Sequence, residues 1–230
     1  MNRLRGESMK NKLWIMMIIL FSCVLMGYVD AIIQPEYFIK SAIKVVLFLT
    51  LPLIYFILYK DKMIKTLFSI SKKALKTAFT LGISLYVFIV VGYLLLQNVI
   101  DFSQITGALS SNIGVNASNF IFVAIYISII NSLLEEFFFR GFSFITLKQY
   151  SSRTFAYFFS ALAFALYHVA MMIGWFSIPI FLLMIIGLMI GGILFNFLNE
   201  KYNSIYVSWI VHLFANLGIN TVGLILFGII

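Results

Sequence analysis

The feature that most constrains the fold is a series of apolar stretches of about 20 residues, separated by short polar breaks. A stretch of this length matches the hydrocarbon thickness of a bilayer, in which helices and closed barrels alone satisfy their backbone hydrogen bonds. The chain is 63% hydrophobic and 10% charged, which lies outside the range of soluble globular domains. We therefore predict an all-α fold: a polytopic transmembrane helical bundle of seven or eight spans, with no sizeable soluble domain.

The expected spans cover about residues 13–29, 38–59, 78–100, 120–140, 154–172 and 175–197, and a seventh begins near residue 204. No small-x-small cleavage site follows the first stretch, so we expect a retained helix rather than a signal peptide. Pro52 predicts a kink in the second span. Gly187, Gly191 and Gly192 predict close helix packing in the sixth. The segment after Gly218 either continues the seventh span or forms a short eighth helix.

The basic residues predict the orientation of the chain. Six lysines lie between residues 60 and 76, in a partly amphipathic segment that we expect along the inner membrane surface. The segment 101–119 holds one acid and no base, as external loops do. We therefore expect a multi-pass protein of the cell membrane with a cytoplasmic N-terminus. The net charge of +8 is explained by this orientation, and without an aromatic-basic motif we expect no nucleic acid partner. The single cysteine, Cys23, excludes an internal disulfide and thiolate metal clusters.

Charged groups inside an apolar span cost roughly 3 kcal/mol each at the bilayer centre and usually mark function. The fourth span carries Glu135, Glu136 and Arg140. Glu136 and Arg140 are four residues apart and can pair on one face of a helix, either as part of a site or as a structural ion pair near the cytoplasmic interface. Glu135 is rotated by about 100° from Glu136 and lacks that partner. We expect its free carboxylate to face another helix.

The two histidines of the chain both fall in apolar spans, His168 in the fifth and His212 in the seventh. A single buried histidine is more often a hydrogen-bonded core residue, but two of them beside a glutamate pair favour a shared site. His212 and Asn216 share a helix face and could donate to one substrate oxygen. Phe164, four residues before His168, is expected to pack against its ring. Counted from the inner ends of their spans, His212 lies roughly 12 Å deep and His168 roughly 20 Å, so tilt or a later helix start must bring them together.

These residues form three ordered motifs: EEFFFR (Glu135, Glu136, Arg140), FALYH (Phe164, His168) and HLFAN (His212, Asn216). In kind and order the motifs resemble those of the CAAX protease and bacteriocin-processing family, also called the Abi family, of intramembrane proteases. The resemblance covers about residues 120–220. It implies a catalytic helical core over 120–230, preceded by three N-terminal transmembrane helices with a basic cytoplasmic loop over 1–119.

The resemblance implies an intramembrane endopeptidase that cleaves a membrane-associated peptide or protein at a site open to the cytoplasm. Carried over by position, Glu135 activates water and His168 shares that work or binds the water. His212 and Asn216 stabilise the oxyanion, and Glu136 with Arg140 supports the fourth span. The resemblance implies either no metal, which we favour because HExxH spacing is absent, or zinc held by Glu135, His168 and His212.

Several alternatives remain at the level of sequence. The residue composition is typical of a low-GC bacterium, which favours peptide pheromones, bacteriocin precursors or membrane-anchored regulators over prenylated CAAX proteins as substrates. A non-catalytic bacteriocin immunity protein would act by binding alone. A proton-coupled transporter would use the same residues as a relay, but would be expected to show repeated halves. The sequence predicts no oligomeric state. The protease hypothesis requires the carboxyl group of Glu135 to lie beside both histidine rings.

Overall fold

The structure is a computed structural model that describes residues 2–59, 67–102, 105–107, 109–110, 114–173 and 177–230. Over these residues the chain is helical and contains no strand. Seven of the described helices are long and apolar enough to cross a membrane: Ser8–Ile33, Tyr37–Leu58, Lys72–Leu96, Phe120–Thr146, Arg153–Met172, Ile178–Tyr202 and Ile205–Leu226. The predicted all-α, multi-pass bundle is confirmed, with the smaller of the two expected span counts.

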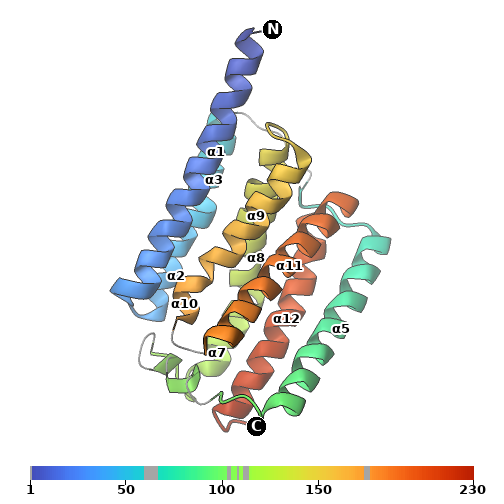
Figure 1. The fold of residues 1–230 in the computed structure, drawn as a ribbon. Coiled ribbons are helices and arrows are strands. Elements are labelled where there is room, and N and C mark those ends of the chain that lie inside the picture. Colours follow the sequence, from blue (N-terminus) through green and yellow to red (C-terminus); the bar gives the residue numbers. More distant parts are fainter. Residues whose placement is uncertain (1, 60–66, 103–104, 108, 111–113, 174–176) are drawn as a thin grey trace.

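The first three spans lie on two sides of the bundle (Figure 1). The first is α1 (Asn2–Tyr28) with the π-helical turn η1 (Val29–Ile33), and beside it lies the second, which consists of α2 (Tyr37–Val45), η2 (Val46–Thr50) and α3 (Leu51–Leu58). The third, α5 (Lys72–Leu96), packs along the last span on the opposite side. The wide turn η2 ends two residues before Pro52, which cannot donate a backbone hydrogen bond, and the kink expected there stays a prediction. The expected surface segment lies partly outside the described residues, which omit 60–66.

The remaining four spans complete the bundle. The fourth consists of α7 (Phe120–Tyr126), η3 (Ile127–Asn131), α8 (Ser132–Glu135) and η4 (Glu136–Thr146). The fifth is α9 (Arg153–Tyr167) followed by the short α10 (Val169–Met172), and the sixth is α11 (Ile178–Tyr202). The seventh, α12 (Ile205–Leu226), runs without a break. The alternative of a short eighth helix after Gly218 is therefore wrong.

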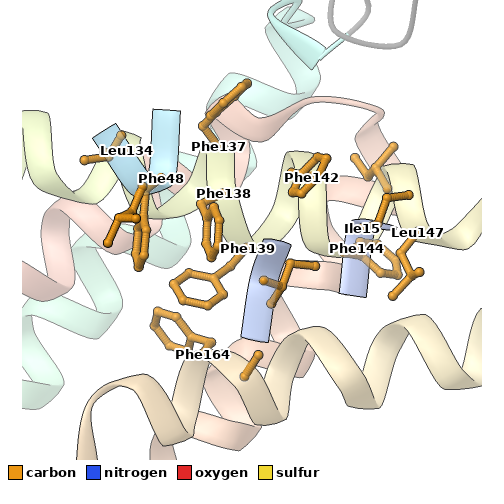
Figure 2. Packing of buried hydrophobic residues seen from close by; sticks show 14 of the residues in the cluster. Ile15, Phe48, Leu134, Phe137, Phe138, Phe139, Phe142, Phe144, Leu147 and Phe164 are labelled. Carbon is orange, nitrogen blue, oxygen red and sulfur yellow. The ribbon is translucent and has the colours of Figure 1, made fainter. Parts of the chain in front are cut away.

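The fourth span is the central helix of the bundle. Every residue from 134 to 147 is buried, so this part of the helix has no lipid-facing side. Phe138, Phe139, Phe142 and Phe144 are completely inaccessible, and Figure 2 shows them following one another along the helix, with Phe48 of the second span stacked on Phe138. A helix that is apolar all round must be enclosed by others. Here α1, η2, α9, α11 and α12 all contact η4, which places any polar group on η4 in the protein interior.

The close packing of α9 and α11 depends on one glycine. A Cβ at Gly192 would lie 3.0 Å from the Cα of Ala161, so the two backbones approach closely at this point. Gly187 and Gly191 face open space, since a Cβ at either position would meet no described neighbour within 4 Å. The expectation that all three glycines serve helix packing is wrong for these two, because they lie on the outer side of α11.

Three side chains of α12 donate hydrogen bonds into the fourth span. Trp209 Nε1 reaches the carbonyl of Ile129 at 3.0 Å, and the amide of Asn216 reaches that of Ile127 at 3.2 Å. Asn220 donates to Ser128 Oγ at 3.0 Å. Residues 209, 216 and 220 share one face of a helix. His212 lies between them in sequence on this face, so α12 presents its ring to the fourth span.

Candidate active site

Glu135 ends α8 in the middle of the bundle, and its carboxylate is almost completely buried. Its Oε1 accepts a hydrogen bond from Lys44 Nζ at 2.6 Å and another from Asn131 Nδ2 at 3.1 Å. The expectation of an unpaired carboxylate is therefore wrong. The group does face another helix, but that helix is α2, and the partner is a buried lysine.

The second carboxylate oxygen of Glu135 faces both histidines. Its Oε2 lies 3.9 Å from His168 Nε2 and 3.8 Å from His212 Nε2. These distances are too long for direct hydrogen bonds, but one water at about 2.8 Å from both atoms can bridge the carboxylate and a ring. The two histidines, from opposite ends of their helices, thus meet at one oxygen atom despite their different counted depths.

The end of α9 orients the ring of His168. The backbone N–H of His168 bonds to the carbonyl of Ala165 at 3.2 Å, which leaves the carbonyl of Phe164 open in the last turn. His168 Nδ1 lies 2.7 Å from that carbonyl oxygen. Because a carbonyl oxygen only accepts, Nδ1 carries the hydrogen, and the Nε2 of a neutral ring faces Glu135 with its lone pair. The ring is therefore oriented to accept a hydrogen bond from water.

His212 lies between the two adjacent glutamates. Its Nδ1 is 2.9 Å from Glu136 Oε1, while its Nε2 faces Glu135. Glu136 Oε2 in turn lies 3.4 Å from Arg140 Nε, so the predicted pair four residues apart is formed. Both side chains of this pair are fully inaccessible, so the pair lies in the protein interior. The pair therefore contacts His212 at Nδ1 and holds the ring with Nε2 towards Glu135.

Aromatic rings enclose the guanidinium group of Arg140. Its central carbon lies 4.1 Å from the centroid of Phe164 and 5.1 Å from that of Phe195. Within the described part of the chain, its nitrogens have no hydrogen-bond partner, so the ion pair and these rings are what stabilise the charge. Phe164 also packs edge-on against His168, with centroids 4.7 Å apart, as the sequence predicts. One phenylalanine thus touches both the ion pair and the site.

Asn216 lies one turn beyond His212 on α12. Its side-chain amide donates to the backbone of η3 rather than to Glu135 or a histidine. An amide group has two N–H donors, so one of them remains for another acceptor. In this arrangement Asn216 joins α12 to the fourth span, in the same way as Asn220 one turn further along.

The zinc set considered from the sequence, Glu135, His168 and His212, does not fit a resident metal in this arrangement. Among the residues that the structure describes, no group of three His, Cys, Asp or Glu side chains is disposed to hold a metal ion. The ammonium group of Lys44 also lies 2.6 Å from the same carboxylate and would repel a second cation there. We therefore derive no step through a metal.

Sequence reasoning missed two residues of the site, Lys44 and Asn131. Lys44 lies seven residues into α2, and a lysine so near a helix end is usually expected to reach back towards water. Asn131 precedes Glu135 by four residues, and this spacing on one helix face could have indicated the contact. Lys44 had no comparable signal, because its partner is 91 residues away.

No curated protein and no solved structure shows a significant match to the chain. Residues 117–218 match the family described as type II CAAX prenyl endopeptidase Rce1-like. The matched segment runs from the start of the fourth span into α12 and contains the glutamate pair, both histidines and Asn216. Over this segment the expected resemblance to CAAX proteases is confirmed, since the chain is similar here to the Rce1-like family.

Proposed function

We propose that this protein is an intramembrane endopeptidase that hydrolyses a peptide bond of a membrane-associated peptide or protein. The observation that carries the proposal is the convergence of Glu135 Oε2 with the Nε2 atoms of His168 and His212, at 3.9 and 3.8 Å. Three chemically active groups from three different spans thus lie close enough to contact one bound water. A purely structural role would not require this arrangement.

In the proposed reaction Glu135 is the general base. A water between Glu135 and His168 loses a proton to Oε2 as its oxygen attacks the substrate carbonyl carbon. When the tetrahedral intermediate collapses, the C–N bond breaks and Glu135 returns the proton to the leaving nitrogen. The products are a carboxylic acid and an amine. His168 holds the water by accepting its second hydrogen at Nε2.

His212 and Asn216 are proposed to stabilise the oxyanion. His212 can donate from Nε2 when both of its ring nitrogens carry protons. Asn216 would contribute the N–H that does not bond to Ile127. Glu136 and Arg140 support the ring of His212 without touching the substrate.

The proposed mechanism uses no metal. The positive charge that a metal would place beside the carboxylate is supplied in this protein by Lys44. Hydrolysis by a carboxylate base and hydrogen-bond donors is chemically complete without a Lewis acid. The proposal is therefore of a glutamate-dependent rather than a zinc-dependent endopeptidase.

We propose a position in the cell membrane with the N-terminus and the opening of the site on the cytoplasmic side. The connections 34–36, 97–119 and 173–177, which alternate with the others along seven spans, contain no lysine or arginine. The basic residues Lys72, Lys148 and Lys201 belong to the opposite end of the bundle, as the positive-inside rule requires for the cytoplasmic face. His212 lies about two turns from that end of α12. Candidate substrates are peptide pheromones, bacteriocin precursors and membrane-anchored regulators.

A cleavage assay tests the proposal. Purified protein in detergent micelles is incubated with internally quenched apolar peptides, some carrying a lipidated cysteine, and products are identified by mass spectrometry. Glu135→Gln should lower the rate by about 10²–10⁴-fold, as expected for loss of a general base. Glu36→Gln, at an exposed carboxylate, is the matched control and should cleave at the wild-type rate. Wild-type cleavage by Glu135→Gln would overturn the proposal, and binding without any cleavage would favour the non-catalytic immunity protein.

A further inference from the structure

We propose that Lys44 is a positioning residue of the active site: it holds one oxygen of Glu135 so that the other faces the reacting water. The inference rests on the proposed function. It concerns the second span, which lies outside residues 117–218 that match the family. It therefore assigns a role to a part of the chain that carries none of the family's motifs.

The contacts of Lys44 are specific in direction. Its Nζ lies 2.6 Å from Glu135 Oε1 and 2.6 Å from Asn131 Oδ1, two acceptors four residues apart on the fourth span. Its third side faces the ring of Tyr167, with the centroid 4.9 Å away. An ammonium group has three donors and no acceptor, so these partners account for its bonding directions. Lys44 thereby occupies Oε1 and leaves Oε2 to the histidines.

Asn131 completes this arrangement. It accepts from Lys44 through Oδ1 and donates from Nδ2 to the same Oε1 at 3.1 Å. The three groups form a closed hydrogen-bonded ring in which no member can turn without breaking a bond. Rotation of the carboxylate, which would exchange Oε1 and Oε2, is therefore opposed from two sides.

Because Lys44 is buried, its positive charge interacts strongly with the carboxylate of Glu135. The side chains of Lys44 and Glu135 are only 7% and 4% accessible, so water screens their attraction weakly. A buried carboxylate that loses its cation is left uncompensated, and it then turns, binds other groups or takes up a proton. Each of these outcomes removes the base from the reacting water, although Lys44 itself touches no substrate.

Lys40 is a second buried lysine on α2 with which Lys44 can be compared. It lies one turn earlier on α2, is buried to a similar degree, and pairs with Asp30 at 2.5 Å. Its partner belongs to η1, so this pair joins the first two spans to each other. Lys44 instead reaches the fourth span. Two buried lysines on one helix thus serve different partners, and of the two only Lys44 contacts the carboxylate of the site.

The test compares four variants in the same cleavage assay. Lys44→Met and Lys44→Gln should lower kcat by about 10²-fold with KM nearly unchanged, because misplacement of a reacting group affects the transition state rather than substrate binding. Lys44→Arg keeps the charge and should recover part of kcat. Lys40→Met should lower the thermal midpoint but retain the kcat of the folded protein.

Several results would overturn the inference. One is a folded Lys44→Gln protein with wild-type kcat, and another is an equal loss of kcat in Lys44→Gln and Lys44→Arg. A third is a loss of kcat in Lys40→Met as large as that in Lys44→Met. The thermal midpoint of each variant separates loss of fold from loss of positioning. Glu135→Gln in the same assay distinguishes the two proposals: if it is inactive while Lys44→Gln is fully active, only the role of Lys44 fails.

Discussion

Two adjacent glutamates of the fourth span occupy different kinds of surroundings. Glu136 is fully inaccessible, and its partner Arg140 is enclosed by phenylalanine rings. Glu135 also has a buried cation as partner, but one of its oxygens faces two histidine rings that are 12% and 9% accessible. The first centre is closed and the second is partly open.

Burial of a charge does not by itself indicate catalysis, because both glutamates are buried and only one of them faces both histidine rings. Both glutamates cost free energy to bury, and both are compensated by a cation. What distinguishes Glu135 is geometry: its cation binds a single oxygen and leaves the other beside groups that can hold water. We therefore expect changes at Glu136 and Arg140 to act mainly on stability, and changes at Glu135 mainly on catalysis.

Removal of Arg140 is expected to have the largest effect on stability. Arg140→Met should lower the free energy of unfolding by about 3–5 kcal/mol, because it leaves the carboxylate of Glu136 buried without its cation. The measurement is unfolding by SDS in mixed micelles, followed by circular dichroism. Lys76→Met, at an exposed lysine, is the control and should unfold like the wild type. An Arg140→Met protein of wild-type stability that fails to cleave would instead place Arg140 in the reaction.

Phe164 offers a second test, because its ring lies between the two centres. Phe164→Leu removes the ring face from Arg140 and the edge contact with His168. We expect a loss of about 1–2 kcal/mol in stability from the cation–π contact and packing, together with a lower kcat. Phe158→Leu, at an exposed position on the same helix, is the matched control. If stability and kcat do not fall together in Phe164→Leu, the two centres are independent.

Two asparagines of α12 separate a structural hydrogen bond from a catalytic one. Asn220→Ala removes hydrogen bonds to α7 and η3 and should cost about 1 kcal/mol of stability without affecting kcat. Asn216→Ala should cost a similar amount and should also lower kcat, if its second N–H reaches the oxyanion. The ratio of kcat values, measured on folded protein at equal concentration, is the deciding quantity. Equal kcat in both variants would assign Asn216 a structural role alone.

A chelator should leave the activity unchanged. With Lys44 beside Glu135, we expect dialysis against EDTA to leave kcat and KM unchanged. A zinc-dependent protease assayed in parallel should lose its activity under the same conditions. Loss of cleavage that is restored by added Zn²⁺ would show that the carboxylate exchanges its lysine for a metal, and would contradict the proposed mechanism.

Much of the fold follows from the sequence, for a clear physical reason. Apolar length alone predicts the seven spans, because the bilayer allows helices of one length and few alternatives. The ends were less predictable: α5 begins at Lys72 rather than near Ala78, since Ser71 caps it by accepting the N–H of Ala74. The outward positions of Gly187 and Gly191 could not be predicted either, because glycine carries no signal of which helix face it occupies.

The contacts of the site are also of two kinds, those that the sequence predicts and those that it does not. Contacts within one helix, such as Glu136 with Arg140 or Phe164 with His168, follow from a spacing of four residues. The meeting of His168 with His212 was suggested by their rarity and by the family resemblance rather than by any rule of geometry. The pairing of Lys44 with Glu135 could not be predicted from the sequence, since contacts between distant spans depend on how helices are staggered and rotated in the bundle.

The distance along the chain between Lys44 and Glu135 has a consequence for biosynthesis. The lysine enters the membrane with the second span, and its counter-charge is translated 91 residues later. Until then the nascent protein carries an uncompensated cation that favours the interface or the translocon over lipid. The proposed catalytic groups are all present only once α12 has been inserted, so a chain that ends before His212 should not cleave.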